Sequence, residues 1–424
     1  MTTDRHIIAK HPAFMPSSGS AWLIALASTV GVAYAVTFAW MCATHVWLFD
    51  ASGRPPAMDF AEFWSAGSLA LHGKALAAYD PRLIHAAEVA VVGHPFPSFI
   101  GWFYPPLFFL VAAAFALLSP STAFVAWTSS TLILQAGTVA AIVRRWPAFF
   151  LAMAPPWVMI CNVIGQDGLL TAALIGAVLL ALPKHQIVGG ILLGFLAYKP
   201  QFGLLFPLVL VFGGYWRGFG SAAISVTALM LFSAAVFGFA TLPAFFHGIA
   251  DATSTHLMTN KLGMWFALQS VYGVLRCLGA SASLAMTLHL CLSALCAIGI
   301  ALLWWSKKVS YGVKAAAVCV ATLFVTPYIW INDIPVLSIA IAFLYCERPL
   351  ARSEWYVVLG SMALVASYPF VRTVPALGGS YPVGLIAAAF IALLVLRRLH
   401  KAKSSYAHAR QENMHSSICA PAQL

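Results

Sequence analysis

The side chains with the clearest capacity for chemistry are ionisable or amide groups that stand at the ends of apolar segments. They are Asp59 and Glu62 after the first segment, Gln166 and Asp167 after the third, Lys199 after the fifth, and Asn332 and Asp333 at a later turn. Ionisable groups at membrane depth are costly, so by default they mark a functional site. The topology derived below brings these side chains to one side of the membrane. Their convergence predicts an active site that opens to the outer leaflet.

Each of these residues also has a structural interpretation that the sequence leaves open. Asp59 could cap the helix that follows it, because Glu62 stands at the spacing of a capping box. Asp167 and Asp333 could each be the N-cap of the next segment. Lys199, which precedes a proline, could extend its ammonium group to the membrane interface. No single residue therefore decides between a structural and a chemical role.

Motifs of soluble enzymes are missing from the chain. It has no Walker A, GxGxxG, HExxH or GxSxG motif in a strand-to-helix context, so a water-soluble nucleotide donor is unsupported. The thirteen histidines and eight cysteines show no metal-ligand spacing, and the cysteines form no CxxC pair. We therefore expect neither a bound metal nor a cofactor.

The elements that position these residues must be membrane helices. The chain has 424 residues, of which 62% are hydrophobic and 8% charged, and its mean hydropathy is +0.89. Such a composition excludes a soluble enzyme. Apolar runs close to the length needed to cross a bilayer recur from Ala21 to Leu396, which predicts an all-α polytopic membrane protein. The first run is too long for a cleaved signal sequence, so we expect it to remain as an anchor.

The positive charges predict the orientation of the chain. The net charge is +11, but the cations stand at the ends of apolar runs, which indicates topology signals rather than a nucleic-acid-binding face. We predict cytoplasmic tails at 1–20 and 397–424. We predict a transmembrane domain at 21–396 with twelve spans, near 21–49, 122–142, 147–163, 168–183, 187–198, 200–215, 219–240, 282–305, 312–328, 333–346, 355–371 and 382–396.

On this map the inside carries sixteen basic and four acidic residues, and the outside seven basic and eight acidic. The outer loops cover 50–121 and 241–280. The first loop contains a helical pattern from Phe60 to Leu71 and a short apolar segment, Tyr104–Leu118, that we expect to lie on the outer face as a shallow helix. The second contains an amphipathic stretch, Phe266–Leu278. The spans near 187–215 are short and flank a proline, which predicts a broken hairpin.

Several segments, in order along the chain, resemble one known family. They are Met58–Pro81 (MDFAEFWSAGSLALHGKALAAYDP), Tyr104–Leu107, Gly165-Gln166, Gly194–Gln201, Ser270–Arg276 and Thr326–Trp330. Together they resemble bacterial glycosyltransferase family 87, the membrane mannosyltransferase-like group also called domain of unknown function 2029. The resemblance covers roughly Ala21 to Leu396.

The resemblance implies a branch of the GT-C superfamily, whose members are integral membrane enzymes with surface-lying helices in the first outer loop. These enzymes take a sugar from a polyprenyl-phosphate-sugar donor and invert its anomeric centre. For this chain it implies a mannose-like hexose, a lipid or glycan acceptor, no cofactor and no nucleic acid. It also implies a place in the bacterial inner membrane with the site facing outward.

Residue by residue, the resemblance makes Asp59 the catalytic base. The residues expected at the donor phosphate or sugar are Lys199, Gln166, Arg82, Arg276, Trp330 and Asp333. Those expected to support the site are Glu62, Tyr104, Asp167 and Asn332. The chemistry agrees, because transfer to a hydroxyl needs a base and needs stabilisation of charge on the leaving phosphate. The chain departs from the family at Trp330–Asp333, where members often have histidine. A transporter or flippase for a lipid-linked or anionic solute is the alternative.

Overall fold

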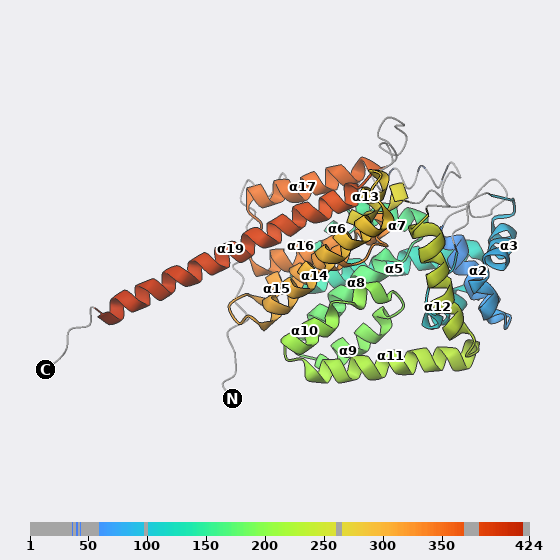
Figure 1. Ribbon diagram of the computed structural model, residues 1–424, viewed down its shortest axis with the longest axis horizontal. Coiled ribbons are helices and arrows are strands. Elements are labelled where there is room, and N and C mark those ends of the chain that lie inside the picture. The colour runs from blue at the N-terminus through green and yellow to red at the C-terminus, as the bar shows by residue number, and fades with distance from the viewer. Residues whose placement is uncertain are drawn as a thin grey trace.

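The computed structural model describes residues 59–96, 101–259, 265–368 and 381–418, together with positions 36, 40 and 43. Within these ranges the chain is helical and contains no strand (Figure 1). The predicted N-terminal tail, and all but three residues of the predicted first span, lie outside them. An all-helical architecture is therefore what the structure shows.

The helices follow the apolar segments of the sequence closely. In chain order they are α2 (Asp59–Leu71), η1 (Ala75–Tyr79), α3 (Pro81–Val92), η2 (Pro106–Phe108), α4 (Phe109–Ala116), α5 (Pro120–Val143), α6 (Pro147–Leu151), α7 (Pro156–Ile164), α8 (Gly168–Ala181), α9 (Gln186–Leu196), η3 (Pro200–Gly203), α10 (Phe206–Phe212), α11 (Trp216–Phe237), α12 (Thr241–Ala252), the π-helical turn η4 (Thr253–Leu257), η5 (Trp265–Ala267), α13 (Val271–Cys277), α14 (Ala282–Trp305), α15 (Tyr311–Val325), η6 (Ile331–Asp333), α16 (Val336–Glu347), α17 (Arg352–Ala366) and α19 (Val383–Ile418).

Four helices in the described ranges are long and apolar enough to cross a membrane. They are α5, α11, α14 and the Val383–His400 part of α19. Shorter apolar helices include α8, α9 and α15, and the predicted bundle of twelve spans is not confirmed. The predicted span near 147–163 is broken, because Pro155 and Pro156 interrupt the backbone hydrogen bonds between α6 and α7. The apolar helices nevertheless identify a membrane protein.

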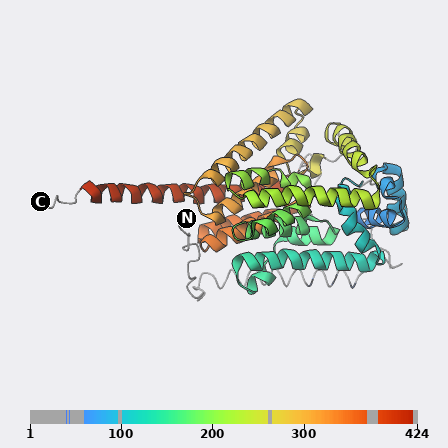
Figure 2. The same cartoon turned by 90° about the horizontal axis from the view of Figure 1, so that it is seen from below.

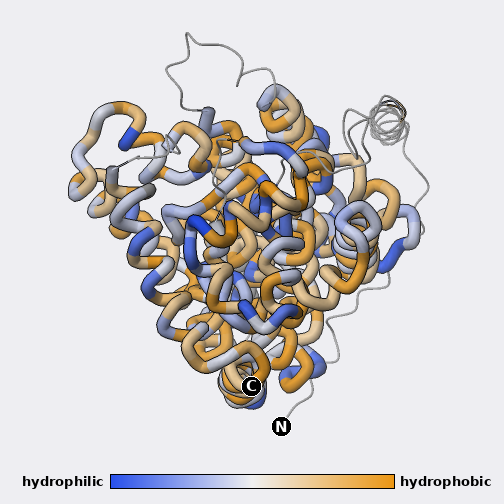
Figure 3. The backbone as a smooth tube through the Cα atoms, turned by 90° about the vertical axis from the view of Figure 1, so that its right-hand side faces the viewer, coloured by the Kyte–Doolittle hydropathy of each residue, from blue (hydrophilic) through white to orange (hydrophobic). Residues whose placement is uncertain are grey.

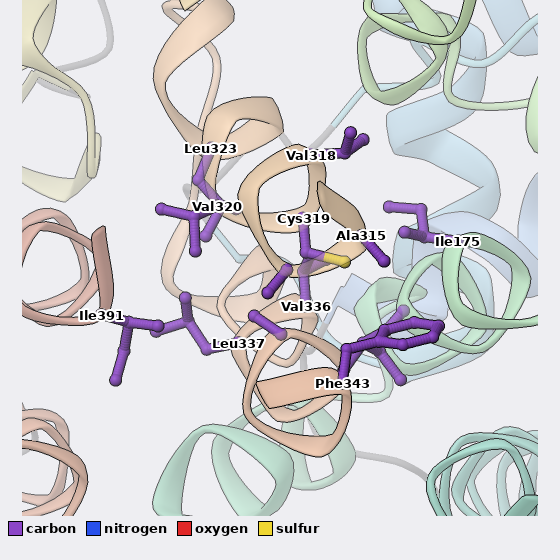
Figure 4. Close-up of a cluster of buried hydrophobic side chains, with 14 of the residues drawn as sticks. Ile175, Ala315, Val318, Cys319, Val320, Leu323, Val336, Leu337, Phe343 and Ile391 are labelled. Carbon is purple, nitrogen blue, oxygen red and sulfur yellow. The ribbon is translucent and has the colours of Figure 1, made fainter. Parts of the chain in front are cut away.

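The centre of the bundle is built from α8, α15 and α16. Nearly every residue of α16 from Val336 to Leu344 is buried, and most of α8 is buried as well. In Figure 4, side chains of α15 and α16 point toward one another, with Ile175 of α8 on one side and Ile391 of α19 on the other. A helix that is apolar on every face belongs in such an interior.

By contrast, α11 and α14 expose apolar side chains to their surroundings. Ile224 on α11 is 72% exposed, and Leu295 on α14 is 66% exposed. Figure 3, viewed from the end that carries α2 and α3, shows apolar stretches on the outside of the bundle as well as inside it. Large apolar patches are rare on soluble monomers, so these faces are suited to contact lipid.

A seam of small residues joins α9 to α11. A Cβ at Gly190 would collide with the Ser221 hydroxyl, and one at Gly194 would collide with Ser225. The Ser221 hydroxyl donates to the Ile187 carbonyl across the seam at 3.1 Å. Small residues four apart let two helix backbones approach closely, as in many membrane helix pairs. The seam fixes α9, whose C-terminal end leads directly into Lys199.

The helices of the predicted first outer loop gather at one end of the molecule, and the C-terminal part of α19 extends from the other (Figures 1 and 2). As predicted, the segment after Tyr104 forms a short helix: α4 ends at Ala116, and α5 begins at Pro120. It packs closely on α2, because Gly67 has no side chain to separate it from the Ala112 carbonyl. The packing of α4 on α2 places Asp59, the first residue of α2, against the loop after α7.

Candidate functional site

Asp59, the predicted base, belongs to a chain of three side chains from three different segments. The Gln166 amide donates to Asp59 Oδ2 at 2.9 Å, and the Tyr104 hydroxyl donates to Gln166 Oε1 at 3.4 Å. The Asp167 backbone N–H also donates to Gln166 Oε1, at 3.3 Å. Because two donors engage the amide oxygen, the amide nitrogen is turned toward the carboxylate. Gln166 thus orients Asp59 and keeps the carboxylate as the acceptor.

Next to this chain lies a buried ion triad. Lys199 Nζ donates to Asp167 Oδ1 at 2.6 Å and to Asp333 Oδ1 at 2.7 Å. All three residues are nearly inaccessible to solvent. The interpretation of Lys199 as a side chain that extends to the membrane interface is therefore wrong, because the start of α8 and η6 each bring a carboxylate to its ammonium group.

The side chains of Asp167 and Asp333 do not cap the helices that follow them. Asp167 occupies the N-cap position of α8, yet its side chain makes no capping hydrogen bond. Its Oδ2 atom is buried without a partner. Asp333 Oδ2 accepts the Trp330 N–H at 2.9 Å, and α16 begins three residues later with Pro335 at its N-cap. The N-cap interpretation of Asp333 is wrong, because its side chain turns back toward η6 and Lys199.

Two glycines make this arrangement possible. Gly165 has φ +71°, a left-handed conformation that glycine adopts without strain, and it ends α7 so that Gln166 and Asp167 turn toward the site. The Trp127 indole holds this turn by donating to the Gly165 carbonyl at 2.9 Å. At Gly168 any Cβ would collide with the Asn332 carbonyl oxygen. The close contact of these two turns brings Asp333 within reach of Lys199.

Aromatic residues that the sequence analysis did not select form the wall beside the triad. Tyr198 stacks on Phe108, with ring centroids 4.4 Å apart, and lies 6.3 Å from the Tyr104 ring. Its hydroxyl donates to the Asp167 carbonyl at 3.2 Å and pairs with the Thr171 hydroxyl at 2.5 Å. The sequence feature that could have identified Tyr198 is its position directly before Lys199, in the segment Gly194–Gln201 that carries part of the family resemblance.

Glu62 lies one helical turn beyond Asp59 and is buried. Burial raises the pKa of its carboxyl well above the ordinary 4.5, and the nearby carboxylates of Glu88 and Asp59 raise it further. Its Oε1 atom has no hydrogen-bond partner. Glu88 on α3 is similarly buried, with a raised pKa, and its Oε2 atom pairs with His85 Nδ1 at 3.2 Å. Glu62 contributes a buried side chain to the packing of α2, whereas Asp59 is the carboxylate that the Gln166 amide orients.

The raised pKa of Glu62 leads to a pH-dependent prediction. The folded chain binds a proton at Glu62 that the unfolded chain releases above about pH 4.5, so stability falls as the pH rises through this window. We expect Glu62→Gln, which resembles the neutral carboxyl, to raise the apparent Tm at about pH 8 and to leave it nearly unchanged at about pH 4. Thermal unfolding of both proteins in detergent at the two pH values measures this. Equal Tm differences at both values would contradict it.

Of the other residues expected at the donor phosphate, Arg82 and Arg276 have described contacts with neither Asp59 nor the triad. Arg82 is exposed on α3, and in the described ranges no ion pair or side-chain hydrogen bond joins it to them. The Arg276 guanidinium stacks on the Trp265 ring, 3.9 Å from its centroid, and donates to the carbonyls of Ala280 and Met258, so it links the segment around Met258 to the start of α14. The Trp330 side chain packs against the cluster of Leu257, Leu268, Tyr272 and Ala285, while its backbone N–H donates to Asp333 of the triad.

Asn332 is buried, and its backbone carbonyl meets α8 at Gly168. Within the described ranges no three His, Cys, Asp or Glu side chains are grouped as ligands for a metal ion. Asp59 and the triad together contain three carboxylates and one ammonium group. The arrangement places the oriented Asp59 carboxylate, which can accept a proton, beside the buried ion triad.

Comparison with known proteins gives one match. The model of glycosyltransferase family 87 matches residues 102–327, more than half of the chain. This range contains Tyr104, Gln166, Asp167 and Lys199, whereas Asp59 and Asp333 lie outside it. No curated protein and no solved structure matches the chain. The extent of the family match is sufficient to conclude that the chain belongs to glycosyltransferase family 87.

Proposed function

We propose that this membrane glycosyltransferase moves a mannose-like hexose from a polyprenyl-phosphate-sugar donor to a lipid or glycan acceptor, with inversion and with Asp59 as the general base. The observation that carries the proposal is the hydrogen bond from the Gln166 amide to Asp59, which orients this carboxylate at the end of the bundle that carries the first outer loop. A base must be held within hydrogen-bond reach of the proton that it removes. The family relationship supports the transferase class and leaves the transporter alternative without a supporting observation.

In the proposed reaction the acceptor hydroxyl oxygen attacks C1 of the sugar from the face opposite the leaving group. The C1–oxygen bond to the lipid phosphate breaks, and the bonding electron pair leaves with polyprenyl phosphate. The hydroxyl proton passes to the Asp59 carboxylate. Inversion follows because attack and departure take place on opposite faces in a single displacement.

The ion triad has a positioning role in this proposal. Lys199 already has two carboxylate partners, so it serves the donor phosphate indirectly, by holding Asp167 and Asp333 in place. Asp167 in turn donates its backbone N–H to Gln166, which orients the base. Gln166, first assigned to the donor, contacts Asp59 directly.

The topology proposal places Asp59 and the triad at the outer face of the bacterial inner membrane. The charge balance of the predicted loops supports this orientation. An outward-facing site also suits a donor whose sugar is already attached to a membrane lipid, because soluble nucleotide sugars are confined to the cytoplasm. The isoprenoid tail would then lie among the apolar helices.

The donor class is tested with the purified full chain in liposomes. Polyprenyl-phosphate-mannose, polyprenyl-phosphate-glucose and a nucleotide-linked mannose are supplied in parallel, each with a bacterial membrane-lipid extract as acceptor. We expect labelled sugar to enter the extract from a lipid-linked donor, with stoichiometric release of polyprenyl phosphate. Transfer from the nucleotide sugar alone would contradict the proposal.

A further inference from the structure

Trp127 lies at the centre of an aromatic cluster close to Asp59. It stands in the first half of α5, and its side chain is buried. Between ring centroids, Trp127 is 4.5 Å from Phe63 and 5.3 Å from Phe115. Phe63 belongs to α2 and Phe115 to α4. The Trp127 ring therefore joins α5 to two helices of the predicted first outer loop.

The polar edge of the same indole reaches the turn that follows α7. Its N–H donates to the Gly165 carbonyl at 2.9 Å, in buried surroundings. The last carbonyls of a helix have no partner within the helix, and a buried indole N–H needs an acceptor, so this bond satisfies both groups. Gln166 is the next residue, and its amide donates to Asp59 from this turn. The Trp127 hydrogen bond therefore fixes the backbone that carries the Gln166 amide.

The Gly165 turn packs directly on the beginning of α2. A Cβ at Gly165 would lie 2.8 Å from Phe60 Cβ and 2.8 Å from the Phe124 ring. Phe60 follows Asp59 directly in α2. Trp127 thus contacts both partners in this packing, α2 through its ring and the turn through its N–H.

A second aromatic path leads from Trp127 to the same turn. Its ring centroid is 6.4 Å from that of Phe108, and the Phe108 ring stacks on Tyr198 at 4.4 Å. The Tyr198 hydroxyl donates to the Asp167 carbonyl at 3.2 Å. Because Asp167 follows Gln166 in the chain, the contacts that begin at Trp127 support the turn on both sides of Gln166.

We propose that Trp127 is a positioning residue for the sugar transfer. It holds α2 and the Gly165 turn at a fixed separation, and this separation sets how the Gln166 amide meets the Asp59 carboxylate. The inference rests on the proposed function, because it takes Asp59 as the base. A displaced turn leaves the base poorly oriented, and misplacing a catalytic group by about 1 Å can cost roughly 10²-fold in rate.

Trp127→Phe tests the indole N–H. Phenylalanine keeps an aromatic ring against Phe63 and removes the donor to Gly165. Trp157→Phe is the matched control, because Trp157 on α7 is completely buried and its indole donates to the Ser338 hydroxyl at 2.8 Å. Each variant loses one buried indole hydrogen bond, so a general loss of stability should affect both alike.

Initial rates are measured with the purified full chain in liposomes, from about pH 4 to about pH 8. The saturating donor is polyprenyl-phosphate-mannose or polyprenyl-phosphate-glucose, whichever the wild type uses faster, and a bacterial membrane-lipid extract is the acceptor. An N–H donated to a carboxylate favours its charged form. We therefore expect Trp127→Phe to lower kcat about tenfold and to move the acid limb of the profile to higher pH.

Trp157→Phe should keep the position of the wild-type acid limb. A Trp127→Phe rate that falls by the same factor at every pH would overturn the proposal, and so would equal shifts in the two variants. If Trp127→Phe does not fold, Phe63→Leu decides, because it keeps the donor to Gly165 and removes the ring on which Trp127 packs. The same shift of the acid limb in Phe63→Leu supports the proposal, and an unshifted limb overturns it.

The positioning role and the proposed function fail separately. Near-wild-type turnover in Asp59→Asn would contradict the proposed function, whatever the profile of Trp127→Phe. An inactive Asp59→Asn together with a wild-type profile in Trp127→Phe would retain Asp59 as the base and remove the role of Trp127.

Discussion

Asp59→Asn should insert and fold like the wild type yet transfer sugar roughly 10²- to 10⁴-fold more slowly, because loss of a general base costs about that much in rate. Asparagine keeps nearly the same shape and still offers an oxygen to the Gln166 amide, which donates to Asp59 in the wild type. It cannot take the acceptor proton. Initial rates with a polyprenyl-phosphate-hexose donor in liposomes measure the change, and thermal unfolding verifies the fold.

Glu62→Gln is the matched control for this result. It makes the same acid-to-amide change three residues along α2, at a buried carboxyl with a raised pKa. Because burial raises the pKa of Glu62 and so favours its protonated form, which an amide resembles, Glu62→Gln should retain most of the activity. Near-wild-type turnover in Asp59→Asn would remove Asp59 as the base, and loss of activity in both variants would point to the integrity of α2 instead.

Lys199→Met should destabilise the protein by about 3–5 kcal/mol, the usual result when one partner of a buried ion pair is removed. Asp167 and Asp333 would then face each other in the interior without a cation. Lys199→Arg, which retains the charge, should lose less. Urea or thermal unfolding in detergent gives the difference, and the activity of the surviving folded fraction shows whether the site is displaced.

Second-site neutralisation separates a positioning role from direct phosphate binding. Asp333→Asn introduced together with Lys199→Met leaves one buried carboxylate fewer, so it should restore part of the lost stability. The opposite result is that Lys199→Met keeps wild-type stability and loses donor affinity, and that adding Asp333→Asn changes neither. This would show that Lys199 binds the phosphate directly.

The longest helices lie where the apolar runs predicted them, because each helix in lipid must satisfy its own backbone. The predicted span 282–305 coincides with α14, and 122–142 lies within α5. The polar residues at the ends of the apolar runs also indicated a pair that would meet. Asp59 contacts Gln166, although 107 positions separate them in the sequence.

Pairing between particular charges could not be predicted in the same way. Lys199 and Asp333 are separated by 134 positions, and their contact depends on how closely two turns approach at Gly168. Nothing in the local sequence of either turn specifies that approach. Arg276 illustrates the same limit, because a lone arginine in an outer loop does not reveal that carbonyls of its own loop will engage it.

The seam between α9 and α11 has a consequence for how this sequence can drift during evolution. Gly190 meets Ser221, and Gly194 meets Ser225, with no space for an added methyl group at either glycine. At Gly194 a larger residue is tolerable only if Ser225 shrinks at the same time, whereas at Gly190 the backbone of Gly218 and Ala222 also blocks an added methyl group. Among relatives that share this architecture, position 190 should therefore remain glycine, while positions 194 and 225 should vary as a pair.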